Sequence, residues 1–160
     1  MNEPPSTGPL RVCHLLKGLG PGGAERLVVA QAVSASATAA QRVAYLIPEK
    51  RHLVPDLEAA GVVVDCLDSP SAARLGWMRR LRAGLRDRPV DVLHVHSPAL
   101  AALGRLLVRT LPRRLRPVVV GTEHNRWPRH HPVTRWANRR TIRLEAVSYT
   151  HLTLPTKVTV

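Results

Sequence analysis

Five short apolar runs recur along this 160-residue chain, and a stretch with helical periodicity follows each of them. We expect strands at residues 11–16, 41–47, 62–67, 90–96 and 117–122, and helices at residues 24–35, 52–60, 71–86, 98–111 and 132–147. Near-continuous apolar runs such as Val118-Val119-Val120 are typical of parallel strands buried on both faces. The alternation therefore predicts an α/β fold, a Rossmann-like doubly wound parallel sheet with a five-stranded core.

The first expected strand leads into a glycine-rich stretch, Gly18-Leu19-Gly20-Pro21-Gly22-Gly23, and the first expected helix follows it. Glycine has no Cβ, so a ligand can approach such a turn closely. The start of a helix presents unpaired N–H groups and the positive end of a dipole. Gly22 and Gly23 are therefore candidates for binding a phosphate or a sugar hydroxyl. A turn that only joins a strand to a helix explains the same residues without a ligand.

The spacing Gly18-x-Gly20-x-x-Gly23 also matches the dinucleotide-binding fingerprint. An enzyme that binds NAD(P) needs in addition an acidic residue at the end of its second strand, about 20 residues further on. Glu49 is the candidate here, and it comes late, after Pro48. An NAD(P)-dependent oxidoreductase therefore remains an alternative function.

Residues that follow strands are the other candidates, because ligands of doubly wound sheets bind outside the carboxyl ends of the strands. His96 and Ser97 follow the fourth expected strand. His94 shares a side of that strand with His96, since side chains alternate along a strand. We expect His94 to pack in the core and His96 to face a ligand. No Cys, Asp or Glu with ligand spacing joins the pair, so no metal site is expected.

Three segments in this order resemble family 4 glycosyltransferases of the GT-B fold. They are Gly-Gly-Ala-Glu at residues 22–25, Asp-x-x-His-x-His at residues 91–96, and Thr-Glu-His-Asn at residues 122–125, which is followed by Thr-Arg-x-x-Asn at residues 134–138. The resemblance covers residues 11–147. It implies a retaining transferase whose N-terminal domain holds the acceptor, a polysaccharide or a lipid-linked glycan. A C-terminal domain would hold the donor, a nucleotide-diphosphate sugar.

The same resemblance implies roles for individual residues. His124 would contact the reacting sugar and is the expected catalytic residue. Residues expected to bind substrate are Gly22, Gly23, Glu25, His96, Ser97, Glu123 and Asn125. The transition state resembles an oxocarbenium ion leaving a diphosphate, and donors fixed at a helix start stabilise the growing negative charge. No metal or other cofactor is expected.

The formal net charge of +13 comes almost entirely from arginine, because Lys17, Lys50 and Lys157 are the only lysines. Such a charge indicates an anionic partner. Residues 74–86 form a basic amphipathic pattern, with Leu75, Met78, Leu81 and Leu85 on one face and Trp77 near its edge. Its arginines Arg79, Arg80 and Arg82 are candidates for contact with an anionic membrane. A core helix with a solvated basic face explains the same pattern.

A non-enzymatic module that binds nucleic acid is a further alternative. The basic residues are not interleaved with stacking aromatic side chains, so nucleic acid is not an expected partner. The polar, proline-rich residues 1–10 do not have the pattern of a signal peptide and are expected to be disordered. No run reaches the length of a membrane span. A cytoplasmic location follows as the expectation, with peripheral contact at the inner face of the membrane.

Two further expectations concern the thiols and the end of the sequence. Cys13 and Cys66 lie in apolar runs and are expected to be buried, free thiols. The composition changes after Val147, so residues 148–160 are expected to be a non-native tail. The chain is then an N-terminal fragment without a donor domain, and we expect it to be inactive on its own.

Overall fold

The computed structural model describes residues 8–123, 132–141 and 147–150, which form six strands and six helices. In chain order the elements are β1 (Leu10–Leu16), α1 (Gly23–Ala35), β2 (Ala39–Tyr45), α2 (Val54–Ala59), β3 (Val63–Cys66), α3 (Gly76–Asp87), β4 (Val92–Val95), α4 (Pro98–Arg109), the 3-10 helix η1 (Arg113–Leu115), β5 (Val118–Glu123), α5 (Pro132–Thr141) and β6 (Val147–Thr150).

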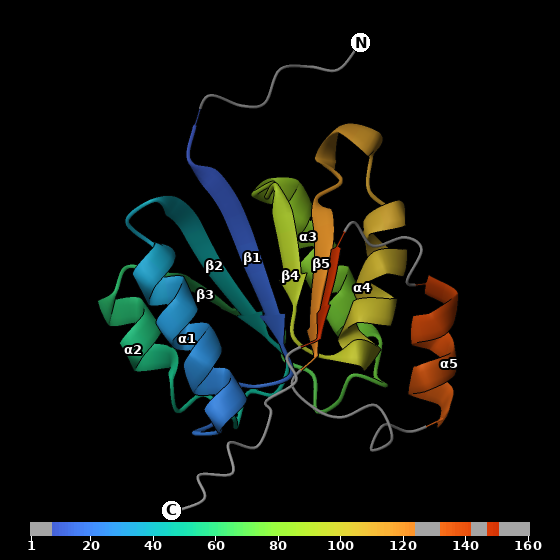
Figure 1. Ribbon diagram of the computed structural model, residues 1–160, viewed down its shortest axis with the longest axis horizontal. Helices are drawn as coiled ribbons and strands as arrows, with labels where there is room; N and C mark the ends of the chain where they lie inside the picture. Colours follow the sequence, from blue (N-terminus) through green and yellow to red (C-terminus); the bar gives the residue numbers. More distant parts are fainter. Residues whose placement is uncertain (1–7, 124–131, 142–146, 151–160) are drawn as a thin grey trace, which may run out of the picture.

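The strands form one parallel sheet in the order β3-β2-β1-β4-β5-β6 (Figure 1). The chain builds the sheet outward from β1 to β3, then crosses back and builds outward from β4 to β6. This confirms the expected Rossmann-like, doubly wound α/β class. The place where the strand order reverses lies between β1 and β4, and in such sheets it opens a crevice at the carboxyl ends of the strands.

Two apolar layers enclose the sheet. On one face, Val43 and Tyr45 of β2 pack with residues of α1 and α2, including Val28 and Leu57. On the other face, Cys13 and Leu15 of β1 and Leu93 and Val95 of β4 pack with residues of α3 and α4, among them Trp77, Leu81, Leu85, Leu100 and Leu107. Figure 1 shows α1 and α2 beside β1 to β3, and α4 and α5 beside β4 and β5. Alternate side chains of each central strand therefore enter opposite layers.

The sheet contains one strand more than the sequence predicted. Residues 147–150 form β6 and pair with β5, with Val147 opposite Val120. The last expected helix accordingly ends at Thr141 rather than near Val147. The five predicted strands are all present, and β6 was not predicted because the sequence analysis assigned residues 148–160 to a tail.

Helix α3 also begins later than expected, at Gly76 instead of residue 71. Side-chain to backbone bonds hold the preceding residues in turns: the Ser69 hydroxyl donates to the carbonyl oxygens of Ser71 (2.8 Å) and Arg74 (3.2 Å). Such bonds offer the backbone an alternative to helix, which helical periodicity alone does not reveal.

Helix α2 stops as the sequence predicted, at Gly61. That residue adopts φ +73°, and the N–H of Val62 donates to the carbonyl of Leu57 at 3.0 Å. A left-handed residue breaks the helical hydrogen-bond pattern and so ends the helix, and glycine adopts this conformation without strain because it has no Cβ. Within the described residues, no helix is both long and apolar enough to cross a bilayer.

Candidate functional site

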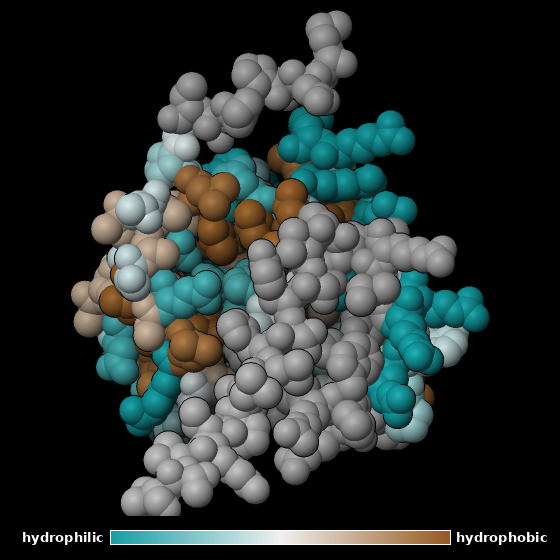
Figure 2. All heavy atoms as spheres, viewed as in Figure 1, coloured by the Kyte–Doolittle hydropathy of each residue, from teal (hydrophilic) through white to brown (hydrophobic). Residues whose placement is uncertain are grey.

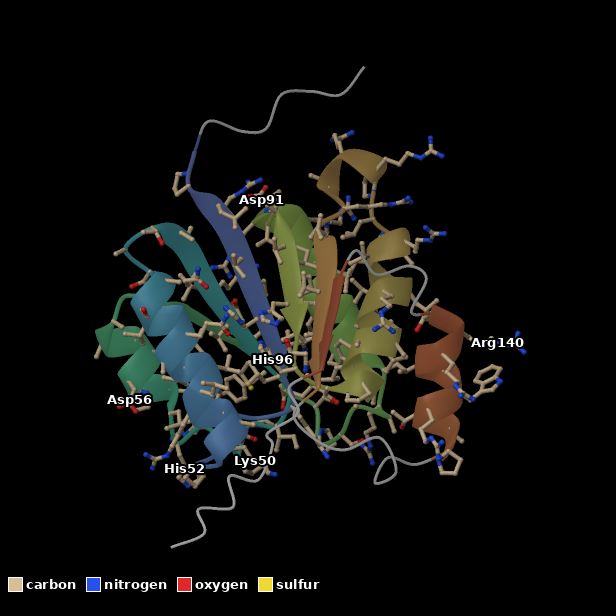
Figure 3. The ribbon with its side chains drawn as sticks, viewed as in Figure 1. Lys50, His52, Asp56, Asp91, His96 and Arg140 are labelled. Carbon is tan, nitrogen blue, oxygen red and sulfur yellow. The ribbon has the colours of Figure 1, made fainter. Side chains whose placement is uncertain are left out.

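The candidate site lies at the carboxyl edge of the sheet, where β1 and β4 are neighbours. Their register places His14 opposite His94, and the N–H of His96 donates to the carbonyl of Leu15 at 3.0 Å. The glycine-rich turn begins directly after β1. This turn and His96 therefore both follow strand ends at the same edge of the sheet. His96 lies near the lower end of the strands in Figure 3, on the same side as Lys50 and His52. The structure thus brings the predicted His96 and the predicted Gly22–Gly23 turn to the same edge of the sheet.

The glycines of this turn differ in what surrounds them. A Cβ added to Gly18 would lie 2.7 Å from Cβ of Lys50, while one added to Gly20 or Gly23 would meet no atom within 4 Å. The N–H of Leu19 donates to the carbonyl of Lys50 at 2.6 Å, which holds the two loops together. Gly18 therefore serves packing, and Gly20 and Gly23 leave open space that a ligand can enter.

Helix α1 starts at Gly23, with Gly22 as its N-cap residue. The N–H of Arg26 donates to the carbonyl of Gly22 at 3.0 Å, and no side chain caps the helix. The Glu25 carboxylate folds back against Gly22, where an added Cβ would collide with it. A carboxylate close to the positive end of the helix dipole is favourable. The same carboxylate repels a second anion. The start of α1 is therefore better suited to bind a sugar hydroxyl, which can donate a hydrogen bond to Glu25, than a diphosphate.

Three histidines from two strands gather on the α1 side of the sheet. His14 Nδ1 lies 3.1 Å from His96 Nε2, and His14 Nε2 lies 3.0 Å from Oε1 of Gln41. His94 Nε2 lies 2.7 Å from the hydroxyl oxygen of Thr122. These contacts join strands β1, β2, β4 and β5 into one polar cluster. His14 is buried, with 2% of its surface exposed, while His94 and His96 are half-buried.

Burial lowers the pKa of His14, and its hydrogen bond with Gln41 opposes that change. Desolvation is the larger cause, because an imidazolium inside a protein loses the hydration that stabilises its charge. The neutral form of His14 is therefore favoured at the pH where exposed histidines begin to titrate.

The same three histidines form the one group of three or more metal-ligating side chains found in the described residues, with candidate ligand atoms all within 4.8 Å of one another. Imidazole nitrogens suit zinc, copper and nickel. The sequence indicated only His94 and His96, for which no metal site was expected. His14 was missed because it lies in an apolar run, and only the pairing of β1 with β4 brings it beside the other two.

Asp91 belongs to the same sequence motif as His94 and His96, yet it lies at the other end of β4. It forms an ion pair with Arg11, with 2.7 Å between Asp91 Oδ1 and Arg11 Nη2. The Arg11 guanidinium accordingly holds the pKa of Asp91 below its usual range. Figure 3 shows Asp91 and His96 at opposite ends of the sheet. Asp91 therefore has a structural role away from the candidate site.

Two of the remaining predicted site residues, Ser97 and Glu123, lie at the carboxyl ends of β4 and β5. Ser97 is the N-cap residue of α4, has extended backbone angles, and its side chain makes no capping hydrogen bond. Glu123 is the last residue of β5, at the same carboxyl edge. His124 and Asn125 lie outside the described residues. Thr122, which sequence analysis did not single out, contacts His94 and so connects β5 with the cluster.

The predicted membrane-contact helix is α3, and two of the three arginines that the prediction singled out bind within the protein. Arg80 Nη1 donates to the carbonyls of Leu67 (2.7 Å) and Asp68 (2.6 Å), and Arg82 donates to both oxygens of Thr110. Arg79 is exposed.

The prediction of which residues form the apolar face of α3 was partly wrong. Trp77 is fully buried and donates its indole N–H to the carbonyl of Ala72 at 3.2 Å. Leu75, at the N-cap position, is 54% exposed. The late start of α3 explains the change, since Trp77, Leu81 and Leu85 follow the helical spacing of its buried side.

The two cysteines occupy different environments. Cys13 is fully buried in the layer beneath α3 and α4, and burial raises the pKa of its thiol to about 12. Cys66 is exposed, contrary to expectation, because it ends β3, which is an edge strand. Both thiols are free, as predicted.

An apolar pocket of about 600 Å³ adjoins the carboxyl edge between α4 and α5. Its lining includes Leu103 and Leu106 of α4 and Val133 and Trp136 of α5, with the cationic side chains of Lys17 and Arg140 also present. Arg140 lies over the Trp136 ring, 5.4 Å from its centroid. Figure 2 shows hydrophilic residues gathered on the side of this view where Figure 1 places α5. The pocket therefore combines an apolar wall with a cationic rim.

Comparison with known proteins identifies the class to which this fold and site belong. A family model described as Glycosyltransferase Family 4 matches residues 11–155, nearly the whole chain. The chain belongs to glycosyltransferase family 4. This favours the transferase interpretation over the NAD(P)-dependent oxidoreductase and the nucleic-acid module. The match also continues past Val147, the expected end of the native domain.

One solved structure similar to the chain is the crystal structure of HepE from Anabaena in complex with UDP. The TM-score is 0.66 at 15% sequence identity, a level at which the similarity shows the fold alone. The alignment covers 87% of this chain and 37% of the HepE chain, so the chain spans well under half of that protein's length. No curated protein sequence matches the chain.

Proposed function

We propose that the chain is the acceptor-binding half of a retaining glycosyltransferase that uses a nucleotide-diphosphate sugar. The observation that carries this proposal is that His96 and the Gly22–Gly23 turn both follow the ends of the neighbouring strands β4 and β1, at the carboxyl edge of the sheet. In a doubly wound sheet this is where a ligand binds. Membership of family 4 supports transfer of a sugar as the reaction.

The electrostatics of the turn support an acceptor there rather than the donor diphosphate. Glu25 places a carboxylate against Gly22, at the start of α1. Coulomb repulsion between this carboxylate and a diphosphate opposes donor binding, whereas a sugar hydroxyl can donate a hydrogen bond to it. The donor, a nucleotide-diphosphate sugar, then binds mainly to a second domain facing this edge. The complex of HepE with UDP is consistent with a nucleotide-linked donor in this fold.

The acceptor class we propose is a glycan linked to a lipid, with a polysaccharide as the alternative. The apolar pocket between α4 and α5 suits a hydrocarbon chain, since burying apolar surface stabilises a complex by roughly 25 cal/mol per Å². Lys17 and Arg140 can pair with phosphate groups between lipid and glycan. A lipid-linked acceptor also agrees with a peripheral position on the cytoplasmic face of an anionic membrane. Neither nucleic acid nor a metal ion is part of this proposal.

The catalytic residue we propose is His124, supported by its position in the sequence directly after Glu123, the last residue of β5. A hydrogen bond from its ring to the reacting sugar would be strongest in the transition state. Glu123, Asn125 and Ser97 would bind hydroxyl groups around it. Removing one preorganised donor of this kind costs about 10²–10³ in rate.

A binding experiment on the 160-residue chain tests the acceptor role. The ¹⁵N-labelled chain is titrated with a short-chain prenyl diphosphate sugar, with UDP and with NADPH. We expect the prenyl-linked sugar to shift the signals of Lys17, Gly23 and His96, and UDP to bind near 1 mM, or about −4 kcal/mol. Micromolar binding of UDP or NADPH without an effect of the prenyl-linked sugar would overturn the proposal.

A second experiment measures the transfer of sugar from radiolabelled nucleotide sugars to a lipid extract. The reaction requires a cleft with two walls, so we expect no product from the 160-residue chain alone. Turnover clearly above background would contradict the proposed division into acceptor and donor halves.

A further inference from the structure

Three imidazoles share one side of the sheet at two neighbouring strands. His94 lies on β4, His96 follows it by two residues, and His14 of β1 lies directly opposite His94. Side chains two residues apart along a strand lie on the same side of it. The three ring centroids are accordingly 4.1 to 5.3 Å from one another. We call this group, His14, His94 and His96, the histidine cluster.

The spacing of the ring nitrogens is close to that of a metal site. One nitrogen from each ring lies within 4.8 Å of the other two, and His14 Nδ1 is 3.1 Å from His96 Nε2. Zn–N bonds of about 2.0–2.1 Å at tetrahedral angles separate two ligand nitrogens by about 3.4 Å. The closest pair therefore needs little change, and the widest pair must close by at most about 1.4 Å. Rotation of the half-buried rings of His94 and His96 supplies this movement and turns their nitrogens towards a common ion.

Gln41 makes the outer contact that is typical of a histidine ligand. Its Oε1 lies 3.0 Å from His14 Nε2, and an amide oxygen accepts hydrogen bonds, so Nε2 carries the proton and Nδ1 faces the cluster with its lone pair. Metal-binding histidines almost always donate their second N–H in this way, which fixes the ring and raises its basicity. His14 and Gln41 are 2% and 9% exposed, so water competes little for this bond.

From these relations we propose that His14, His94 and His96 bind a divalent transition-metal ion of the zinc class, with Gln41 as the outer hydrogen-bond partner of His14. Three imidazoles are a known ligand set for zinc and leave one tetrahedral position for an oxygen ligand such as water. Copper and nickel share the preference for imidazole. The ion takes no part in the proposed transfer reaction, and its binding does not depend on the proposed function.

The hydrogen bonds already present in the cluster are compatible with this site. The ion replaces the contact between His14 and His96, because coordination is stronger than the hydrogen bond that it displaces. His94 and His96 have further contacts, and a ligand needs only one nitrogen of its ring for the metal. The Thr122 hydroxyl, 2.7 Å from His94 Nε2, can orient that ring as Gln41 orients His14. Burial also lowers the pKa of His14, so few protons compete with the ion there.

Metal binding is measured on the unchanged 160-residue chain at neutral pH by calorimetric titration with zinc chloride. Long-range ¹H–¹⁵N correlation of the histidine rings then locates the ion in the labelled chain. We expect the first equivalent of Zn²⁺ to occupy one site and to shift the ring signals of all three cluster histidines together, with His14 Nδ1 among the coordinated nitrogens. No binding, or a first equivalent that leaves any of the three rings unchanged, would overturn the proposal.

Two variants of Gln41 test the outer contact in opposite directions. Gln41→Glu nearly preserves the shape of the side chain and gives His14 Nε2–H a carboxylate partner, which makes Nδ1 a better ligand, so we expect tighter binding of Zn²⁺. Gln41→Met, of similar size, removes the acceptor and should weaken binding by about 10–100-fold. A purely structural role of Gln41 would not move the two affinities in opposite directions. Equal affinities in the two folded variants would overturn the assigned role of Gln41.

Removing a ligand gives the complementary test. His94→Ala and His96→Ala each take away one imidazole from a half-buried position, and we expect either change to weaken binding of Zn²⁺ by more than about 100-fold, beyond the effect of an outer partner. His52→Gln, at an exposed position, is the matched control and should keep the affinity of the unchanged chain. Dispersed amide spectra establish that each variant is folded. A folded His96→Ala chain with unchanged affinity, or an equal loss in His52→Gln, would place the ion elsewhere and overturn the proposal.

Discussion

Arg11 and Asp91 form a two-point ion pair across the amino-terminal edge of the sheet, between β1 and β4. Arg11 Nη2 lies 2.7 Å from Asp91 Oδ1, Arg11 Nε lies 3.1 Å from Asp91 Oδ2, and the backbone N–H of Arg11 donates to the same Oδ2 at 2.9 Å. The neighbouring pair His14 and His94 lies further along the same two strands. The ion pair therefore helps to hold the register that brings the histidines together.

Replacing Asp91 should weaken the fold in a pH-dependent way. Arg11 lowers the pKa of Asp91, so the ion pair stabilises the folded state above the ordinary pKa of aspartate, and this contribution is lost as the pH falls through the lowered value. Because Arg11 is 44% exposed, we expect Asp91→Asn to cost only about 1 kcal/mol at neutral pH. Urea unfolding of the unchanged chain and of Asp91→Asn should show that their difference in free energy of unfolding becomes smaller towards pH 3. A difference that stays constant with pH would contradict the ion-pair explanation. Asp87→Asn, at an exposed position, is the control.

Substitution by alanine should affect stability differently at two glycines of the turn. Gly18→Ala places Cβ 2.7 Å from Cβ of Lys50, so a loop must shift, and we expect a loss of about 1–3 kcal/mol in the free energy of unfolding. Gly23→Ala meets no atom within 4 Å and improves helix propensity, so stability should be equal or up to about 1 kcal/mol higher. Binding of the prenyl-linked sugar should nevertheless weaken in Gly23→Ala. Unchanged binding would exclude close approach of the ligand to this residue.

Removing Arg42 should be among the more damaging changes. This buried arginine forms an ion pair with Asp65 and donates to the carbonyl of Gly84 at 3.1 Å, which ties β2 and β3 to α3. Losing one partner of a buried pair costs about 3–5 kcal/mol, and we expect Arg42→Met near the lower value because Arg88 also binds Asp65. The exposed Arg88→Met is the matched control and should cost less than about 1 kcal/mol. Chemical denaturation measures both; equal losses would refute the special role of Arg42.

The two thiols should differ sharply in reactivity. Cys13 is fully buried and its thiol pKa is raised to about 12, whereas Cys66 is exposed. The thiolate is the reactive species, so we expect a disulfide reagent to modify Cys66 quickly in the native protein, and both cysteines after denaturation. Cys66→Ser should abolish the fast reaction. Fast modification that persists in this variant would mean that Cys13 is accessible.

Membrane contact by α3 can be tested cleanly only at some of its arginines. Arg80 and Arg82 bind the protein itself, so charge reversal there would disturb the fold. Arg79 and Arg86 are exposed, and each basic residue near an anionic surface contributes about 1 kcal/mol to membrane binding. We expect Arg79→Glu with Arg86→Glu to reduce co-sedimentation with phosphatidylserine vesicles while stability is retained. Arg113→Glu with Arg114→Glu in η1 has the same charge change and is the control. Equal effects of the two double variants would indicate non-specific attraction.

The sequence predicted the main features of the fold because they depend on local patterns. Apolar runs identified β1 to β5, and Gly61 identified the end of α2. The late start of α3 was not predictable in this way, since the hydroxyl of Ser69 competes with helix through contacts that periodicity does not contain. The burial of Trp77 and the exposure of Cys66 depend in turn on where α3 begins and on which strand lies at the edge.

The sequence by itself determined that His96 and the Gly22–Gly23 turn follow strand ends, and hence that both belong to one edge of a parallel sheet. It also carried the family motifs, which the match over residues 11–155 confirms. Only the tertiary structure placed His14 beside His96 and Gln41 beside His14, and separated Asp91 from the histidines of its own motif. The physical reason is register: which residues of β1, β2 and β4 lie opposite one another depends on the packing of both faces of the sheet, and a shift of one residue would turn each of these side chains to the other face.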